Sequence, residues 1–142
     1  MSSLEASSDL IIIPLKTFGE AHIIDRVNGT KYIGTVSGSK KHGAGILTGE
    51  NGSEYKGFFN NDKKYGMGIF TSFNGNIYYG HFLNDKKHGM GMEELLSGDT
   101  YEGNFSNNKK NGDFKYFRYA TEETYKVQFV DDEMIGEMKE DN

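Results

Sequence analysis

The chain of 142 residues has the length of one domain, carries a net charge of −5 and contains 19 glycines, one proline and no cysteine. The lack of cysteine excludes a disulfide framework, a thiolate zinc site and a cysteine nucleophile. No apolar run approaches the length of a membrane span, and the charge pattern lacks the basic footprint of a nucleic-acid-binding protein.

The first 27 residues are predicted to form an N-terminal segment that ends in a degenerate repeat. Residues 1–9 are polar and rich in serine, residues 10–13 are β-prone, and residues 19–27 resemble the second half of a repeat. An atypical first unit is typical of repeat arrays, because the outer edge would otherwise present unpaired backbone groups. We therefore expect residues 1–27 to contain a capping repeat.

Four repeats of equal length follow, over residues 28–120. Tyrosine and glycine recur in the same phase in each unit, with a period of 23. The tyrosines are Tyr32, Tyr55, Tyr78 and Tyr101. The glycines two positions later are Gly34, Gly57, Gly80 and Gly103. A fixed period of this length indicates an array in which each unit packs on its neighbours.

Each unit has the pattern of two short strands joined by a polar turn. In the second unit Tyr55, Gly57 and Phe59 alternate on one face, since strand side chains have a period of two. The polar turn 60–64 precedes the returning strand, and Asn-Gly pairs follow it as hairpin turns. This pattern predicts an all-β fold, an antiparallel meander in one elongated, twisted sheet.

The final residues, 121–142, are predicted to form a degenerate closing repeat and an acidic tail. The partial unit starts one residue late at Tyr125, and Val127 stands where earlier units have glycine. In the tail, Met134, Ile135 and Met138 have weak helical spacing. Residues 113–142 carry four basic and nine acidic residues, whereas residues 28–112 carry ten lysines and eight acidic residues.

The motif Tyr-x-Gly-x-aromatic, then Lys-His-Gly-x-Gly and an Asn-Gly or Asp-Gly turn, resembles the MORN (membrane occupation and recognition nexus) repeat. The best matches lie at residues 55–68 and 78–91. The resemblance implies hairpins stacked into a curved sheet with a groove. It also implies a non-enzymatic role in scaffolding or partner capture, in a cytoskeletal, ciliary or membrane-linked assembly, and hence a cytoplasmic or peripheral membrane location.

The aromatic columns have two compatible interpretations. Aromatic rings cover the holes that glycine leaves in a sheet, so the rings can be the core of the fold. The same rings can instead line an open groove that holds a partner peptide or helix, because aromatic side chains are good interface anchors. The candidate residues are Tyr32, Tyr55, Phe59, Tyr78, Phe82, Tyr101 and Phe105.

The opposite face of the sheet is also apolar in the first three units. Its candidate binding residues are Met67, Ile69, Met90 and Met92. A sheet with two apolar faces must cover the second one. Residues 10–15 or the C-terminal tail, a partner protein, or a second copy of the chain in a homodimer would each do so. Methionine-rich surfaces adapt to helical ligands, which favours a partner helix.

Lysine pairs form another column with the period of the repeat, at the turns on one edge of the sheet. They are Lys40, Lys41, Lys63, Lys64, Lys86, Lys87, Lys109 and Lys110. One interpretation is a solvated edge that keeps the array in solution. The alternative function is peripheral binding to anionic phospholipid, since each lysine near such a surface contributes about 1 kcal/mol.

No catalytic constellation stands out from the repeat pattern. His42 and His88 lie two repeats apart, roughly 19 Å by the strand spacing, which is too far to share a metal ion. The sequence therefore predicts a non-enzymatic interaction module with no catalytic residue, metal or cofactor, which binds a protein rather than nucleic acid.

Overall fold

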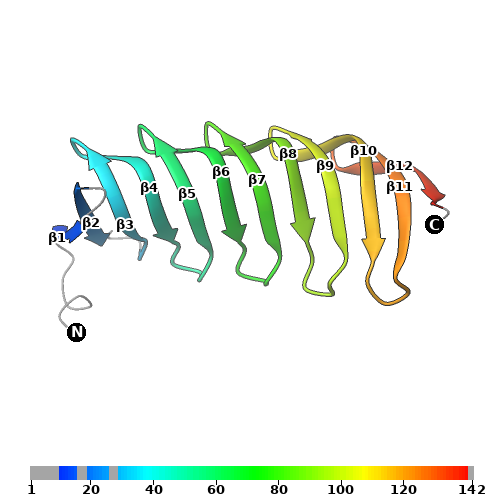
Figure 1. Ribbon diagram of the computed structural model, residues 1–142, viewed down its shortest axis with the longest axis horizontal. Coiled ribbons are helices and arrows are strands. Elements are labelled where there is room, and N and C mark those ends of the chain that lie inside the picture. Colours follow the sequence, from blue (N-terminus) through cyan, green and yellow to red (C-terminus); the bar gives the residue numbers. More distant parts are fainter. Residues whose placement is uncertain (1–9, 16–18, 26–28, 141–142) are drawn as a thin grey trace.

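The computed structural model describes residues 10–15, 19–25 and 29–140, with side chains described from residue 29 onward. The described residues form twelve strands of one antiparallel sheet, in which each strand pairs with its neighbours in sequence (Figure 1). The strands are β1 (Leu10–Leu15), β2 (Gly19–Asp25), β3 (Lys31–Ser37), β4 (Lys40–Thr48), β5 (Glu54–Asn60), β6 (Lys63–Thr71), β7 (Ile77–Leu83), β8 (Lys86–Glu94), β9 (Thr100–Ser106), β10 (Lys109–Arg118), β11 (Glu123–Val130) and β12 (Glu133–Lys139). The predicted all-β array of hairpins is confirmed.

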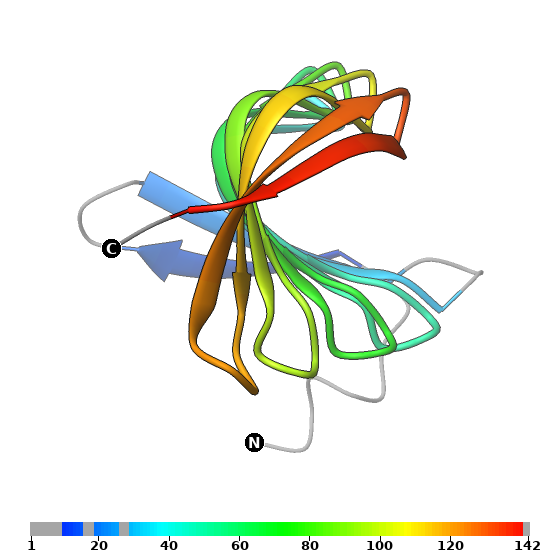
Figure 2. The ribbon, with the colours of Figure 1, turned by 90° about the vertical axis from the view of Figure 1, so that its right-hand side faces the viewer.

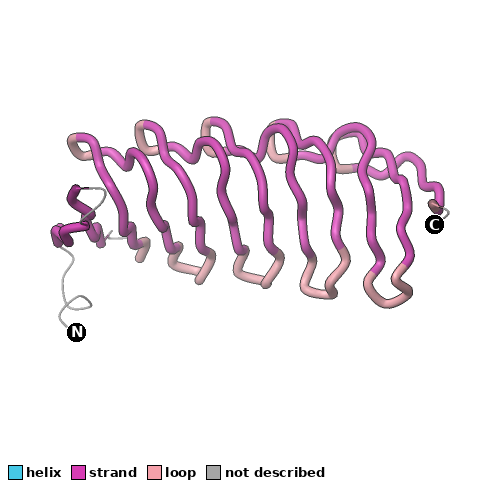
Figure 3. The backbone as a smooth tube through the Cα atoms, viewed as in Figure 1, coloured by secondary structure: helices cyan, strands magenta, loops and turns pink. Residues whose placement is uncertain are grey.

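The sheet is strongly twisted and its strands are curved, as the view along the long axis shows (Figure 2). Short turns within the units lie along one long edge, and longer turns between units lie along the other (Figure 3). The ladder is regular except within each unit, where the register shifts, for example between Gly57 and Phe58. Such bulges bend a strand and increase its twist, so they contribute to the curvature.

The face that carries the tyrosine column, here called the aromatic face, is the core of the protein. Tyr32, Tyr55 and Tyr78 are 0%, 1% and 2% exposed. Their rings alternate edge-to-face with phenylalanine rings of the same and the next unit, as in the 5.1 Å Tyr78–Phe82 and 5.0 Å Tyr78–Phe105 contacts. One aromatic row therefore binds successive units together.

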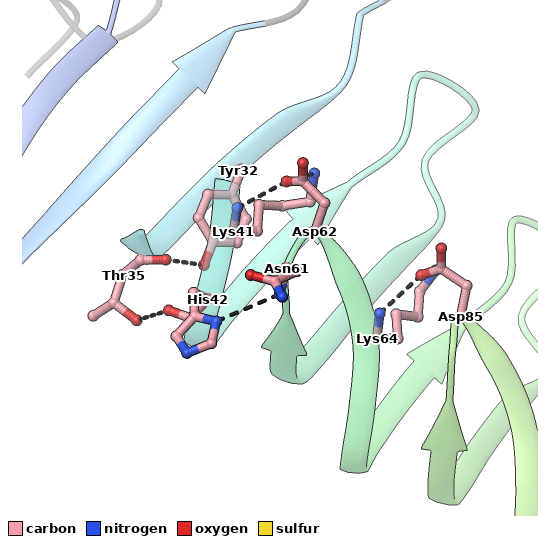
Figure 4. Close-up of polar contacts among 8 residues, drawn as sticks. All are labelled: Tyr32, Thr35, Lys41, His42, Asn61, Asp62, Lys64 and Asp85. Atoms are coloured by element: carbon pink, nitrogen blue, oxygen red, sulfur yellow. Dashed lines mark hydrogen bonds and ion pairs between the residues drawn. The ribbon is translucent and has the colours of Figure 1, made fainter. Parts of the chain in front are cut away.

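Glycine makes room for each tyrosine ring. A Cβ atom at Gly68 would lie 2.5 Å from Cε1 of Tyr55, closer than any van der Waals contact. The Tyr55 hydroxyl donates to the carbonyl oxygen of Phe58 at 2.9 Å, so the ring lies along its own strand. Tyr32 makes the same contact with Thr35 at 2.6 Å (Figure 4).

The fourth unit keeps the core by a different arrangement. Phe114 replaces the glycine of the second strand and is 2% exposed, with its ring against Gly103. This ring occupies the place that tyrosine fills in the earlier units. Tyr101 instead stacks on Tyr116, with ring centroids 4.6 Å apart and planes within 11°. Val127, which replaces the next glycine, is fully buried.

The described segments near the two ends of the chain extend the sheet instead of covering its second face. Residues 10–15 form β1, which pairs with β2, and residues 133–139 form β12, which pairs with β11. The expectation that either segment folds across the second face is therefore wrong. The weak helical spacing at residues 134–138 also does not lead to a helix, because the hairpin turn at 131–132 returns the chain along β11.

Adjacent units are joined at the short turns by one repeated contact. The backbone N–H of Lys64 donates to Oδ1 of Asp85 at 2.8 Å, and the Asp85 N–H donates to the Lys64 carbonyl at 3.2 Å (Figure 4 shows the carboxylate contact). Asn84 and Asp85 have φ of 48° and 73°, as a type I′ turn requires. The same contact occurs at Asp62, Asn108 and Asp132.

Replacing Asp85 with alanine is expected to lower the free energy of unfolding by about 2 kcal/mol, because the Lys64 N–H loses its acceptor and alanine is strained at positive φ. Asp85→Asn is the matched control, since Asn108 makes the same contact at 2.9 Å in the next unit. Urea unfolding checks both. Equal losses in the two variants would contradict the role of the side-chain oxygen.

Candidate protein-binding face

The face opposite the tyrosines, here called the methionine face, carries large apolar side chains that remain exposed. The exposed fractions include 53% for Met67, 56% for Met90 and 49% for Phe58. Ile69 is 40% exposed, and Met92 is half-buried. No described element lies over this face, because all twelve strands belong to the one sheet. Exposed apolar surface of this kind marks interaction sites.

The register brings these residues into rows that cross the sheet along its long axis. Ile69 pairs with Tyr79, which pairs with Met92. In a second row, Met67 pairs with His81, and Met90 of the next strand pairs with Asn104. The apolar character ends in the fourth unit, where polar residues such as Glu102 continue the rows.

The aromatic candidates are placed differently from the methionines. Phe59, Phe82 and Phe105 are 3%, 5% and 1% exposed, and the first three tyrosines are equally buried. Tyr101 is half-buried. This burial favours the core interpretation of the aromatic columns, because a ring that is already covered by its neighbours has little area to offer a partner.

Burial also changes the acidity of the tyrosines. It raises the pKa of Tyr32, Tyr55 and Tyr78 to about 12, because the ionised phenolate would lie out of water. A raised folded-state pKa contributes stability that is fully present below the unfolded value of about 10 and is lost as pH rises towards 12.

The stability of the fold against urea is therefore expected to fall between about pH 10 and pH 12. In the folded protein, three of the nine tyrosines should ionise near pH 12, later than after unfolding in urea. Tyrosinate absorbance during a pH titration measures both. The Tyr78→Phe variant should lose one of the groups that ionise near pH 12; an unchanged titration would contradict the assignment.

The lysine column divides into two sets. The second lysine of each pair lies over the tyrosine ring of its own unit, as in Lys64 Nζ at 5.4 Å from the Tyr55 ring centroid and Lys87 Nζ at 5.2 Å from the Tyr78 ring. Burial lowers the pKa of Lys64 and of Lys87. The inner lysines are Lys41, Lys64, Lys87 and Lys110.

The first lysine of each pair projects into solvent. The register places Lys63 opposite Asn60 and Lys86 opposite Leu83, on the methionine face at the short-turn edge. The outer lysines are Lys40, Lys63, Lys86 and Lys109. Half of the predicted ladder is therefore available to a ligand, and the other half is part of the core packing.

A further exposed apolar row lies at the longer turns and was not predicted. Phe73, Leu96 and Tyr119 are 71%, 76% and 63% exposed. Their spacing is the period of the repeat, a sequence signal that would have found them. The Leu96 side chain lies against Gly75 of the preceding turn, and Tyr119 lies against Gly98, so part of this row serves to pack successive turns together.

Within the described residues, no cluster of three histidine, aspartate or glutamate side chains is suited to hold a metal ion. The same residues include no helix long and apolar enough to cross a membrane. The features that remain are an uncovered apolar face and a row of lysines beside it.

A single open sheet of stacked hairpins, with an exposed apolar face, defines a repeat protein of the interaction-module class. The family model of the MORN repeat matches residues 32–54, 55–77, 78–100 and 101–112, more than half of the chain. The chain belongs to the MORN repeat family, whose repeat is a non-enzymatic module that generally interacts with proteins or membranes. No curated protein matches the chain.

Proposed function

We propose that this protein is a non-enzymatic scaffold that captures a protein partner, a peptide or a helix, on its methionine face. The observation that carries the proposal is the exposure of Met67 and Met90, at 53% and 56%, on a face over which no described element lies. Burying such side chains against a partner is favourable, at about 25 cal/mol for each Å² of apolar area.

The contact surface in this proposal consists of Met67, Ile69, Met90 and Met92, with Phe58 added. Buried Tyr55 and Tyr78 support it from below, because their rings hold the strands that carry the methionines. As part of the same proposal, we place the protein in a cytoskeletal, ciliary or membrane-linked assembly on the cytoplasmic side. A second copy of the chain is the competing occupant of the same face.

The test is site-specific photo-crosslinking in the source cells, with a photoreactive amino acid at position 67 or 90. Cross-links to one defined protein are expected from both positions and not from position 73, an exposed apolar site at the longer turns. Met67→Ala with Met90→Ala should weaken capture of that protein, whereas Phe73→Ala should not. Capture that is unchanged in the double variant would contradict the proposal.

The alternative function is binding to anionic phospholipid through the outer lysines. The specific observation in its favour is that Lys40, Lys63, Lys86 and Lys109 are exposed in a row along one edge. Their combined attraction would be about 4 kcal/mol, at the roughly 1 kcal/mol typical of a lysine near the surface. Binding to phosphatidylserine vesicles should then fall steeply with salt. No sedimentation with such vesicles at low salt would exclude this function.

A further inference from the structure

A groove runs along the methionine face. One hollow of about 210 Å³ is lined by Met67, Tyr79, Met90 and Met92 together with Glu102. It shares Met90 and Glu102 with the next hollow along the sheet, of about 420 Å³. That hollow in turn shares Lys126 with a third, of about 320 Å³, beside β12. The three hollows follow one another along the long axis of the array.

The outer lysines lie on the same face at its short-turn edge, where Lys63 is opposite Asn60 and Lys86 is opposite Leu83. The nearby acidic side chains are engaged on the other side, since Asp85 Oδ1 lies 2.8 Å from the Lys64 N–H and 3.9 Å from Lys64 Nζ. Asp132 contacts Lys110 in the same way, at 4.0 Å. Within the described part of the chain, no ion pair involves Lys40, Lys63, Lys86 or Lys109. The short-turn edge of this face therefore carries positive charge, whereas the hollows themselves are lined by the carboxylates of Glu102, Asp113, Glu137 and Glu140.

The spacing of the repeat selects the conformation of a ligand that lies along this groove. Equivalent residues of adjacent units are two strands apart, which is roughly 10 Å. In an α-helix, residues seven apart lie on one face and are separated by about 10.5 Å. In an extended peptide, a separation of about 10 Å corresponds to three residues, and the third side chain points to the opposite face. A helix therefore matches the repeat, and an extended strand does not.

On the basis of the proposed function, we infer that the partner segment is an amphipathic α-helix that lies along the groove, with acidic residues on the flank that faces the outer lysines. Its apolar residues at i and i+7 meet Met67 and Met90. Acidic residues with the same spacing meet Lys63 and Lys86. A contact over three units needs about 20 helical residues.

The test uses synthetic helical peptides with leucine on one face and a length of about 20 residues, which follows from the rise per residue. One peptide carries glutamate along the flank of the leucine stripe, a second carries lysine there, and a third has the glutamate composition in scrambled order with a central proline. Fluorescence anisotropy measures their binding to the full chain at low and high salt. We expect the glutamate peptide to bind about tenfold more tightly than the lysine peptide at low salt, with a smaller ratio at high salt.

Charge reversal identifies the lysines that are responsible. Lys63→Glu with Lys86→Glu should reverse the preference between the two peptides. Lys31→Glu is the matched control, because this exposed lysine lies at the other end of the strands, opposite Thr48. The control variant should keep the preference of the wild-type chain.

Three outcomes would overturn the inference. Equal binding of the glutamate and lysine peptides would contradict the acidic flank of the partner. Binding of the proline peptide as tight as that of the helical peptides would contradict its helical conformation. No binding of any helical peptide, while photo-crosslinking still depends on Met67 and Met90, would overturn the helix and leave the proposed function intact. The inference would also be overturned if the wild-type chain did not discriminate between the peptides while the Lys63→Glu, Lys86→Glu variant lost binding to vesicles. That result would indicate that the outer lysines bind lipid.

Discussion

Replacing Tyr78 with alanine is expected to lower the free energy of unfolding by about 3–5 kcal/mol, the usual cost of deleting a buried aromatic ring. The ring is 2% exposed, lies between Phe82 and Phe105, and covers Gly91. Since each unit contacts only its neighbours, the loss falls in the middle of the array and should separate the unfolding of its two halves.

Urea unfolding followed by tyrosine fluorescence and circular dichroism measures both effects. Tyr78→Phe is the control, because it keeps the ring and removes only the 2.8 Å hydrogen bond from the hydroxyl to the His81 carbonyl. That variant should lose about 1 kcal/mol. An alanine variant no less stable than the phenylalanine variant would show that the ring does not hold the units together.

Replacing Gly68 with alanine is expected to cost about 3 kcal/mol, although alanine adds a single methyl group. The new Cβ would lie 2.5 Å from Cε1 of Tyr55, so the ring must leave its place against the strand. Gly68 is not among the glycines with positive φ, so the loss reflects packing and not backbone strain.

Gly136→Ala is the matched control for this substitution. Gly136 also lies in a second strand of a unit, but its nearest neighbour would be Gln128 Oε1 at 3.6 Å, an ordinary contact. This control should change stability by less than about 0.5 kcal/mol. Thermal and urea unfolding compare the two variants. Equal losses of stability would contradict the conclusion that the absence of a side chain at Gly68 leaves space for the tyrosine ring.

The repeat itself could be predicted because its signals lie in residues that are close together in the sequence. A period of two within strands, a fixed period between units and turn residues between them all favour the same meander. The burial of Tyr32, Tyr55 and Tyr78 follows from the same pattern, since a glycine two positions away leaves space for a ring. The sequence left open whether these rings form the core or line a groove, and their burial favours the core.

The partner of each inner lysine could not be predicted from the lysine column alone. Lys63 and Lys64 are identical neighbours in sequence, but the strand places them on opposite faces. Lys64 meets the Tyr55 ring and Asp85, a residue of the next unit, whereas Lys63 meets solvent. Asp85, which pairs with Lys64 and not with Lys63, belongs to a different hairpin. The stacking of units therefore decides which lysine charge remains available to a ligand.

The repeat pattern thus predicted the strands of the four units, their order and their aromatic columns, because these depend on neighbours within a unit and on repetition. Which surfaces remain exposed depends on how the whole sheet is assembled. The tertiary structure placed residues 10–15 and 133–139 as strands of the same sheet, and it left Met67 and Met90 uncovered. From sequence alone, apolar residues near a chain end are compatible both with a layer over the sheet and with a strand at its edge. In the structure they form edge strands, because their backbones pair with the neighbouring strands.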